Sequence, residues 1–207
     1  MDSENSSAHL LSLNHLKQAT DVMAAAFLND PLWVYLVPEE AKRRQLLPRF
    51  YRVFFNVWLS NRQAFGVGDP LQALAVWSYP DQKTEFFKLV GPGFLKLFFS
   101  PVIMSFIRAR SVFSQFEIMQ QRYAPDPHYY LNTIAVLPAS QGKGLASQLI
   151  RPFLIKADQE AVGIYTETMT PANVNLYTHY GFVCQEEFRV PGTALSIWSF
   201  YRPAKSE

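Results

Sequence analysis

The order of secondary-structure signals in the last eighty or so residues constrains the fold more than any other feature of the chain. β-prone runs and helical patterns follow one another there, as strand, helix, strand, helix, strand and strand, over residues 129–137, 142–157, 162–169, 171–180, 182–190 and 194–201. Such an order predicts an α/β or α+β layer, with helices packed on a sheet. Upstream, the pattern predicts helices over 13–28 and 39–59, a hairpin over 63–79 and a mostly helical stretch over 85–121 that prolines interrupt.

The composition fits one folded unit without a strong charge. The chain has 207 residues, of which 49% are hydrophobic and 17% charged, so apolar burial can offset the entropy of ordering. We expect a polar, flexible tail over residues 1–10 and a single domain over 11–205. The net charge of +2 argues against a nucleic-acid partner, because phosphate binding needs a larger basic excess.

Cysteine and histidine are too sparse for a disulfide framework or a structural metal. The single cysteine, Cys184, cannot form an intrachain disulfide, and the four histidines show no ligand-type spacing. We therefore predict no metal and a reducing, cytoplasmic location.

One segment, residues 89–107, is nearly free of charge and just reaches the length of a membrane span. Lys96 and the helix breakers Pro92 and Pro101 interrupt it, which favours broken helices that cover the core or line an apolar cavity. A membrane-contacting hairpin is the alternative, and we predict no membrane partner. The basic cluster of the 39–59 helix is expected to be solvated; it comprises Lys42, Arg43, Arg44, Arg49 and Arg52.

A glycine-rich loop opens the 142–157 helix directly after a predicted strand. The loop reads Gln141-Gly142-Lys143-Gly144-Leu145-Ala146. A helix start has unpaired N–H groups and a partial positive charge, and glycine lets an anion approach them. The sequence fails the P-loop pattern and only nearly matches the dinucleotide pattern, so a turn without a ligand stays an alternative.

A second element follows the strand over 162–169. Pro171 fits the first turn of a helix, and Asn173 and Tyr177, four residues apart, share one face of it. A phenol in that place can donate a proton to a leaving group, or can simply be a core residue. Gly181 is a typical stop for the helix.

Together, in this order, the two elements resemble the GCN5-related N-acetyltransferase (GNAT) family. The family's Gln/Arg-x-x-Gly-x-Gly/Ala motif stands here as residues 141–146, and its later motif as Asn173, Tyr177 and Gly181-Phe182. The clear resemblance covers about residues 129–201, and the pieces AVWSYP, QGKGLAS and YTETMTPANVNLYTHYGF are similar to the puromycin N-acetyltransferase-like branch. The resemblance implies a mixed, mostly antiparallel central sheet flanked by helices.

The resemblance also implies an enzyme: an N-acetyltransferase that moves the acetyl group of acetyl-CoA to a primary amine of a small molecule, by direct attack in a ternary complex. Tyr177 would protonate the departing thiolate, Glu167 would be the base, and His128 is the second candidate base. A bulge near the strand 134–136 would free backbone groups for pantetheine, and one N–H there would polarise the thioester carbonyl. The implied cofactor-binding residues are Ile134, Ala135, Val136, Gln141, Gly142, Lys143, Gly144, Leu145, Ala146, Ser147 and Asn173.

The chain departs from the family pattern in places, and other functions stay open. Thr170 stands where many members have Asn, and Pro152 interrupts the helix that follows the loop. The alternatives are a non-catalytic acyl-CoA-binding module and a protein or peptide N-acetyltransferase. We expect residues 86–116 to wall the acceptor site, and a homodimer can form through edge strands near Trp198.

Overall fold

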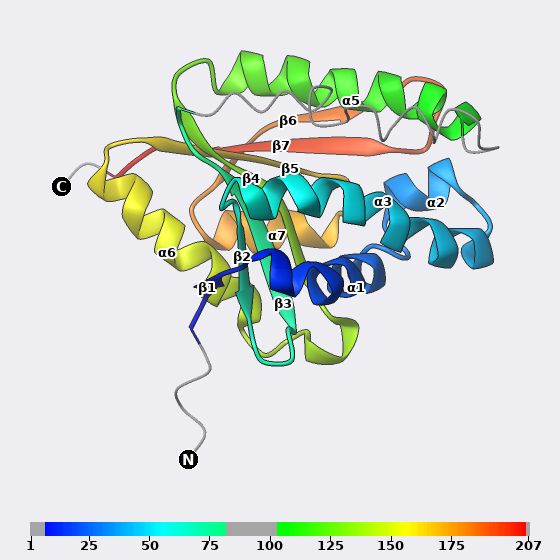
Figure 1. Cartoon of the computed structure of the whole chain (residues 1–207). Helices are drawn as coiled ribbons and strands as arrows, with labels where there is room; N and C mark the ends of the chain where they lie inside the picture. Colours follow the sequence, from blue (N-terminus) through cyan, green and yellow to red (C-terminus); the bar gives the residue numbers. More distant parts are fainter. Residues whose placement is uncertain (1–6, 82–102, 206–207) are drawn as a thin grey trace.

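Seven strands form one sheet in the computed structural model, which describes residues 7–81 and 103–205 (Figure 1). The strand order is β1-β2-β3-β4-β5-β7-β6, and only the β4–β5 pair is parallel. The strands are β1 (His9–Leu10), β2 (Ala64–Val67), β3 (Ala73–Ser78), β4 (His128–Val136), β5 (Gly163–Thr168), β6 (Val183–Arg189) and β7 (Ser196–Arg202). The mixed, mostly antiparallel sheet flanked by helices is therefore confirmed. Trp198 lies on β7, inside the sheet, so β6 is the edge strand there.

The described helices agree with the predicted ones, with one addition. They are α1 (Leu16–Ala26), α2 (Pro31–Leu36), α3 (Glu40–Ser60), α5 (Ile103–Tyr123), α6 (Leu145–Gln159) and α7 (Ala172–His179), with 3-10 turns at Leu13–His15 and Pro138–Ser140. The sequence analysis missed α2, because Asn29-Asp30-Pro31 was interpreted only as the end of α1. Asp30 is in fact a helix cap: its Oδ1 accepts a hydrogen bond from the Leu32 N–H at 3.0 Å.

The sheet is covered on both faces, as the alternation along β3 shows. Ala75 and Trp77 pack toward α6, where the Trp77 ring stacks on Phe153 at 4.2 Å between centroids. Leu74 and Val76 point the other way, into a core made with α1 and α3. α5 lies on the same side of the sheet as α1 and α3, whereas α7 shares the side of α6 (Figure 1). α6 continues through Pro152 without ending.

Arg43 is not part of a solvated face, which corrects the prediction for the basic cluster of α3. Its side chain is buried, with 4% of the residue exposed. It donates hydrogen bonds to three main-chain carbonyls, those of Leu28, Val37 and Pro38, at 2.7–2.8 Å. The charge therefore fixes the turns on either side of α2, which a periodicity argument cannot show.

The predictions for the apolar segment fall mostly outside the described residues. Of the stretch 89–107, only 103–107 is described, as the start of α5. Of the proposed acceptor wall, 86–116, the described side chains are those from Val112 onward. In the described ranges, no helix has the length and apolar character that crossing a membrane requires.

β4 and β5 separate halfway along their length. They pair through His128–Leu131 and Gly163–Thr166, and no later residue of β4 is paired with β5. The register of β4 against β3 shifts at the same point: Leu131 lies opposite Trp77 and Thr133 opposite Val76, so Asn132 has no partner on β3. This arrangement is a β-bulge, and it marks the start of a gap in the sheet.

Candidate active site

The part of β4 beyond the bulge presents backbone groups to the gap. Leu137 donates its N–H to the Gln72 carbonyl of the β3 side at 2.9 Å. Alternate residues of an antiparallel strand bond to the same neighbour, so Ala135 also faces β3, whereas the N–H and C=O groups of Ile134 and Val136 face the gap. The backbone groups of Ile134 and Val136 thus face the gap, and the cofactor roles of Ile134, Ala135 and Val136 all stay predictions.

The glycine loop lies where β4 leads into α6. Gly142 and Gly144 have φ values of 75° and 76°, in the left-handed region, and a Cβ at either position would meet nothing within 4 Å. Gly144 is the N-cap of α6, so the first N–H groups of that helix are open toward the same space. These features fit a diphosphate: the helix end supplies donors and positive potential, and the glycines leave room for approach.

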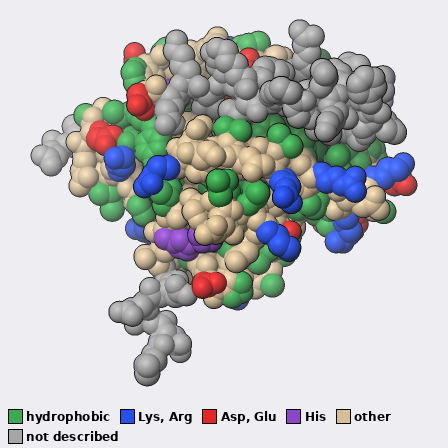
Figure 2. Space-filling view, in the orientation of Figure 1, with side chains coloured by type: hydrophobic (Ala, Val, Ile, Leu, Met, Phe, Trp, Pro, Cys, Tyr) green, Lys and Arg blue, Asp and Glu red, His purple; other side chains and the backbone are tan. Residues whose placement is uncertain are grey.

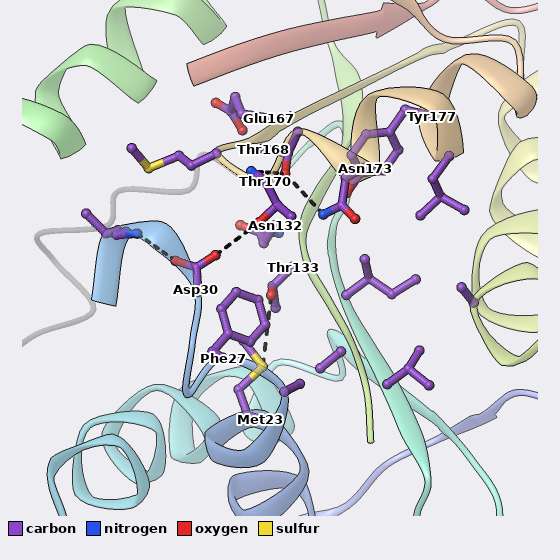
Figure 3. A pocket seen from close by; sticks show the side chains of 18 of the residues that line it. Met23, Phe27, Asp30, Asn132, Thr133, Glu167, Thr168, Thr170, Asn173 and Tyr177 are labelled. Atoms are coloured by element: carbon purple, nitrogen blue, oxygen red, sulfur yellow. Dashed lines mark hydrogen bonds between the residues drawn. The ribbon is translucent and has the colours of Figure 1, made fainter. Parts of the chain in front are cut away.

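A cavity of about 860 Å³ joins the loop, the gap and α7 (Figure 3). Of the predicted site residues, all but Lys143 line it, namely Ile134, Ala135, Val136, Gln141, Gly142, Gly144, Leu145, Ala146, Ser147, Glu167, Asn173 and Tyr177. The fold thus brings together the residues of both motifs, which are about thirty positions apart in the sequence.

α7 carries Asn173 and Tyr177 to the cavity. The Asn173 side-chain nitrogen donates to Thr168 Oγ1 at 3.1 Å, and the Thr170 N–H donates to the same oxygen at 3.1 Å. Tyr177 is 3% exposed and its ring packs on Phe182 and Phe200. Burial raises the pKa of Tyr177 to about 12, so the phenol keeps its proton at neutral pH.

Glu167 reaches the cavity from the other face of the sheet. Side chains alternate along β5, and Ile164 packs toward α6, so Tyr165 and Glu167 project to the side of α5. Burial raises the pKa of Glu167 to about 8. Its Oε1 is buried and has no hydrogen-bond partner within hydrogen-bonding geometry among the described residues, while the phenols of Tyr130 and Tyr165 oppose the effect of burial on the pKa.

His128, the second candidate base, does not line the cavity. Its Nδ1 lies 2.7 Å from the Asp126 carbonyl, which can only accept, so Nδ1 carries the proton. Its Nε2 then accepts from the Gln120 side-chain nitrogen at 2.9 Å. Both ring nitrogens are engaged, and burial lowers the pKa of the imidazole. The structure therefore argues against His128 as the base.

Asp30 and Asn132 are among the polar residues of the cavity that the sequence analysis missed (Figure 3). Burial raises the pKa of Asp30 to about 6, and its Oδ2 lies 3.5 Å from the Thr170 hydroxyl. The Asp-Pro pair could have indicated a helix cap, but nothing in the sequence places it opposite α7. The cavity also has aromatic walls from the N-terminal helices: Phe27, Trp33, Phe50, Tyr51, Phe54 and Trp58.

In the described part of the chain, no group of three or more His, Cys, Asp or Glu side chains could hold a metal ion. The polar groups that line the cavity are instead backbone amides, hydroxyls, side-chain amides and the carboxyl groups of Asp30, Glu117 and Glu167. Such a set suits hydrogen bonding and proton transfer at an organic ligand.

Comparisons with known proteins agree with this geometry. Residues 108–184 match the family model described as an acetyltransferase (GNAT) domain. An uncharacterized N-acetyltransferase of Schizosaccharomyces pombe is 26% identical over 187 residues, which cover 82% of this chain and 71% of that protein.

Two solved structures show the same fold. A histone acetyltransferase HPA2 and related acetyltransferase from Corynebacterium glutamicum superposes with a TM-score of 0.64 at 19% identity, over 98% of each chain. Arylalkylamine N-acetyltransferase 2 from Aedes aegypti superposes with a TM-score of 0.67 at 13% identity, over 98% of this chain and 100% of that one. The similarity to the puromycin N-acetyltransferase-like branch stays a prediction. The matched segment contains the gap, the glycine loop and α7, so the part of the chain that resembles a GNAT acetyltransferase domain is the part that forms the candidate site.

Proposed function

We propose that the chain is an N-acetyltransferase that transfers the acetyl group of acetyl-CoA to a primary amine of a small molecule, by direct attack in a ternary complex. The observation that carries the proposal is the single cavity that extends from the glycine loop, through the gap between β4 and β5, to the aromatic walls of α1–α3. One end suits a diphosphate and the other an apolar amine, and the backbone groups of β4 lie between them.

The glycine loop and β4 would hold the cofactor. The N–H groups from Gly142 to Ser147 would bind the diphosphate, and the gap-facing groups of Ile134 and Val136 would pair with the amides of pantetheine as an added strand would. One of these N–H groups can polarise the thioester carbonyl as its oxygen gains charge. Asn173, whose side chain is bonded to Thr168, would lie beside the pantetheine arm.

The acceptor would enter between α1, α2 and α3. Aromatic rings cover this end of the cavity, and Asp30 is its carboxyl group, so an ammonium ion with an apolar or aromatic body fits it best. Phe113 and Phe116 of α5 complete the wall within the described part of the predicted 86–116 segment. The Aedes aegypti structure belongs to an arylalkylamine N-acetyltransferase by name, which supports an amine of this kind.

Proton transfer would use Glu167 and Tyr177 from the two faces of the sheet. Acetyl-CoA supplies the acetyl thioester, whose carbonyl carbon the amine nitrogen attacks, so that an N–C bond forms and a C–S bond breaks. Glu167, as the carboxylate, takes the proton that the amine gives up. Tyr177, as the phenol, gives its proton to the departing sulfur. The raised pKa of Tyr177 keeps its phenol protonated at neutral pH, and the raised pKa of Glu167 means that its carboxylate form, the proton acceptor, predominates above about pH 8.

Two measurements test the proposal. Calorimetry with CoA should give one site per chain, and thiol release from acetyl-CoA should depend on an added amine in a panel of arylalkylamines, diamines and short peptides. Turnover with a small amine but not with peptides supports the proposal. Binding of CoA without turnover of any amine would instead show a non-catalytic CoA-binding module, and turnover of peptides alone a peptide N-acetyltransferase.

A further inference from the structure

Asn132 occupies the one position of β4 that has neither a β3 partner nor a β5 partner. The bulge at this residue shifts the alternation of the strand by one. Leu131 packs toward α6 before the bulge, and Ile134 packs toward α6 after it, whereas Thr133 reaches Met23 of α1. Asn132 therefore lies at the point where the side-chain alternation of β4 changes, at the start of the gap. Its side chain lines the cavity (Figure 3).

The orientation of the Asn132 amide follows from its partners. The side-chain nitrogen lies 3.1 Å from the Tyr130 carbonyl and 2.9 Å from Ser78 Oγ. A carbonyl only accepts, so the atom that faces Tyr130 must be the NH₂ group. Both hydrogens of the NH₂ group are then donated in hydrogen bonds, and the side-chain amide cannot flip without losing one of them. The carbonyl oxygen, Oδ1, has no hydrogen-bond donor among the described side chains.

We propose that Asn132 Oδ1 accepts an N–H of the acceptor amine and turns the nitrogen lone pair toward the gap. The inference rests on the proposed function. A neutral primary amine has two N–H groups and one lone pair, so one accepted N–H together with the Glu167 carboxylate fixes where the lone pair points. Because Asn132 Oδ1 is an oriented hydrogen-bond acceptor, it favours primary amines over amines that carry no N–H group.

A neutral oxygen is suited to this task in a way that the two carboxyl groups are not. Asp30 and Glu167 change charge as they take or lose a proton. Asn132 Oδ1 can accept a hydrogen bond both from the ammonium ion and from the neutral amine, so it can hold the nitrogen before and after proton removal. The bonds to Ser78 and Tyr130 hold the amide in place without any movement of the strand.

Amine binding to the unmodified protein gives the first test. Trp33 and Trp58 line the cavity, so tryptophan fluorescence of the CoA-bound chain can report the dissociation constant of an amine. We expect 2-phenylethylamine to bind at least tenfold more tightly than its trimethylammonium analogue, which has the same charge and ring but no N–H group. Equal affinities, or no binding of 2-phenylethylamine, would overturn the inference.

A pair of variants gives the second test. Asn132→Ala should weaken 2-phenylethylamine binding and raise its KM by about tenfold or more, with the dissociation constant of CoA unchanged. Ser78→Ala removes one partner of the amide but keeps Oδ1 and the bond to Tyr130, so it should weaken amine binding much less than Asn132→Ala does. Equal effects of the two variants would show a purely structural role, and thermal unfolding of both checks that they fold.

The two levels of the proposal fail in different ways. A chain that binds no CoA contradicts the proposed function itself. If the chain binds CoA and acetylates an amine, but Asn132→Ala binds and acetylates that amine as the unmodified protein does, only the role of Asn132 is contradicted.

Discussion

Glu167 and Tyr177 meet at one cavity although they come from opposite faces of the sheet. The sequence analysis named Tyr177 from the motif and Glu167 from its place at the end of the strand before it, but it could not show that β4 and β5 separate or that both side chains line one cavity. Glu167 titrates near neutral pH because burial raises its pKa to about 8, whereas burial raises the pKa of Tyr177 to about 12. The opposite roles that we propose for them in proton transfer would therefore follow from their surroundings.

The first prediction concerns the pH dependence of kcat. A base must be deprotonated, so kcat should rise with pH and level off above about 8, the pKa of Glu167. Glu167→Gln should lower kcat by about 10²-fold or more and remove this inflection. Thiol-release rates between pH 6 and 10 measure both effects. An unchanged pH profile in the variant would assign the base to another group.

The second prediction concerns the phenol of Tyr177. Tyr177→Phe keeps the ring contacts with Phe182 and Phe200, so thermal stability and CoA affinity should stay close to those of the unmodified protein. Loss of the proton donor should reduce kcat by about 10²-fold. Tyr123→Phe is the matched control, because its hydroxyl bonds Glu186 outside the cavity and should not affect kcat. If both variants were equally active, Tyr177 would be a core residue only.

At the scale of elements, the local sequence pattern predicted most of the helices and strands. It missed the features that depend on contacts between distant segments of the chain. The helical period predicted α1, α3 and α6, and the β-prone runs predicted β2–β7, because each pattern lies within one segment, whereas β1 lies inside the stretch 1–10 that was expected to be a flexible tail. The bulge at Asn132 is a mismatch of register between two strands, so no single segment records it. The burial of Arg43 likewise depends on carbonyls of another part of the chain.

The third prediction tests the glycine loop. Gly144→Ala places a side chain in the left-handed region, which should cost about 1 kcal/mol of stability, and puts a methyl group into the space at the start of α6. CoA affinity should fall at least tenfold. Gly192→Ala is the matched control, because Gly192 has a φ of 72°, equally open space and a position in the β6–β7 turn. Calorimetry should show a loss of affinity in the first variant alone.

The fourth prediction concerns the link between α6 and the end of β7. Arg202, whose side chain is 4% exposed, donates two hydrogen bonds to Asp158, and these hold the Asp158 pKa below its ordinary value of 3.8. The resulting stability is present above pH 3.8 and disappears as the pH falls through the lower, folded-state pKa. Asp158→Asn should cost about 3 kcal/mol at pH 7, because it leaves a buried guanidinium unpaired.

Urea unfolding at pH 7 and near pH 3 measures this effect. The difference between Asp158→Asn and the unmodified protein should shrink at the lower pH. Asp21→Asn is the control: the partner of Asp21, Lys17, is 87% exposed, so the change should be within about 0.5 kcal/mol. A similar loss in both variants would mean that the buried pair contributes no more than a surface pair.

On the scale of the whole molecule, the sheet consists of two parts joined by a short parallel pairing. β1–β4 form one part and β5, β7 and β6 the other, and their strands meet only over His128–Leu131 and Gly163–Thr166. The sequence predicted the layers of this architecture but not the gap in it, since the gap is a property of the pairing and not of either strand. A cofactor bound in the gap would bridge the two parts.

The last prediction follows from that bridge. A ligand that binds only the folded state stabilises it by mass action, so CoA at about 100 times its dissociation constant should add about 2.7 kcal/mol and raise the melting temperature. If pantetheine pairs with β4, hydrogen exchange of the Ile134 and Val136 amides should slow most, because they face the gap. The amides of Ala135 and Leu137 face β3 and serve as internal controls. Slowing that is equal at all four positions would show a general gain in stability without strand-like pairing, and the backbone part of the cofactor site would have to be placed elsewhere.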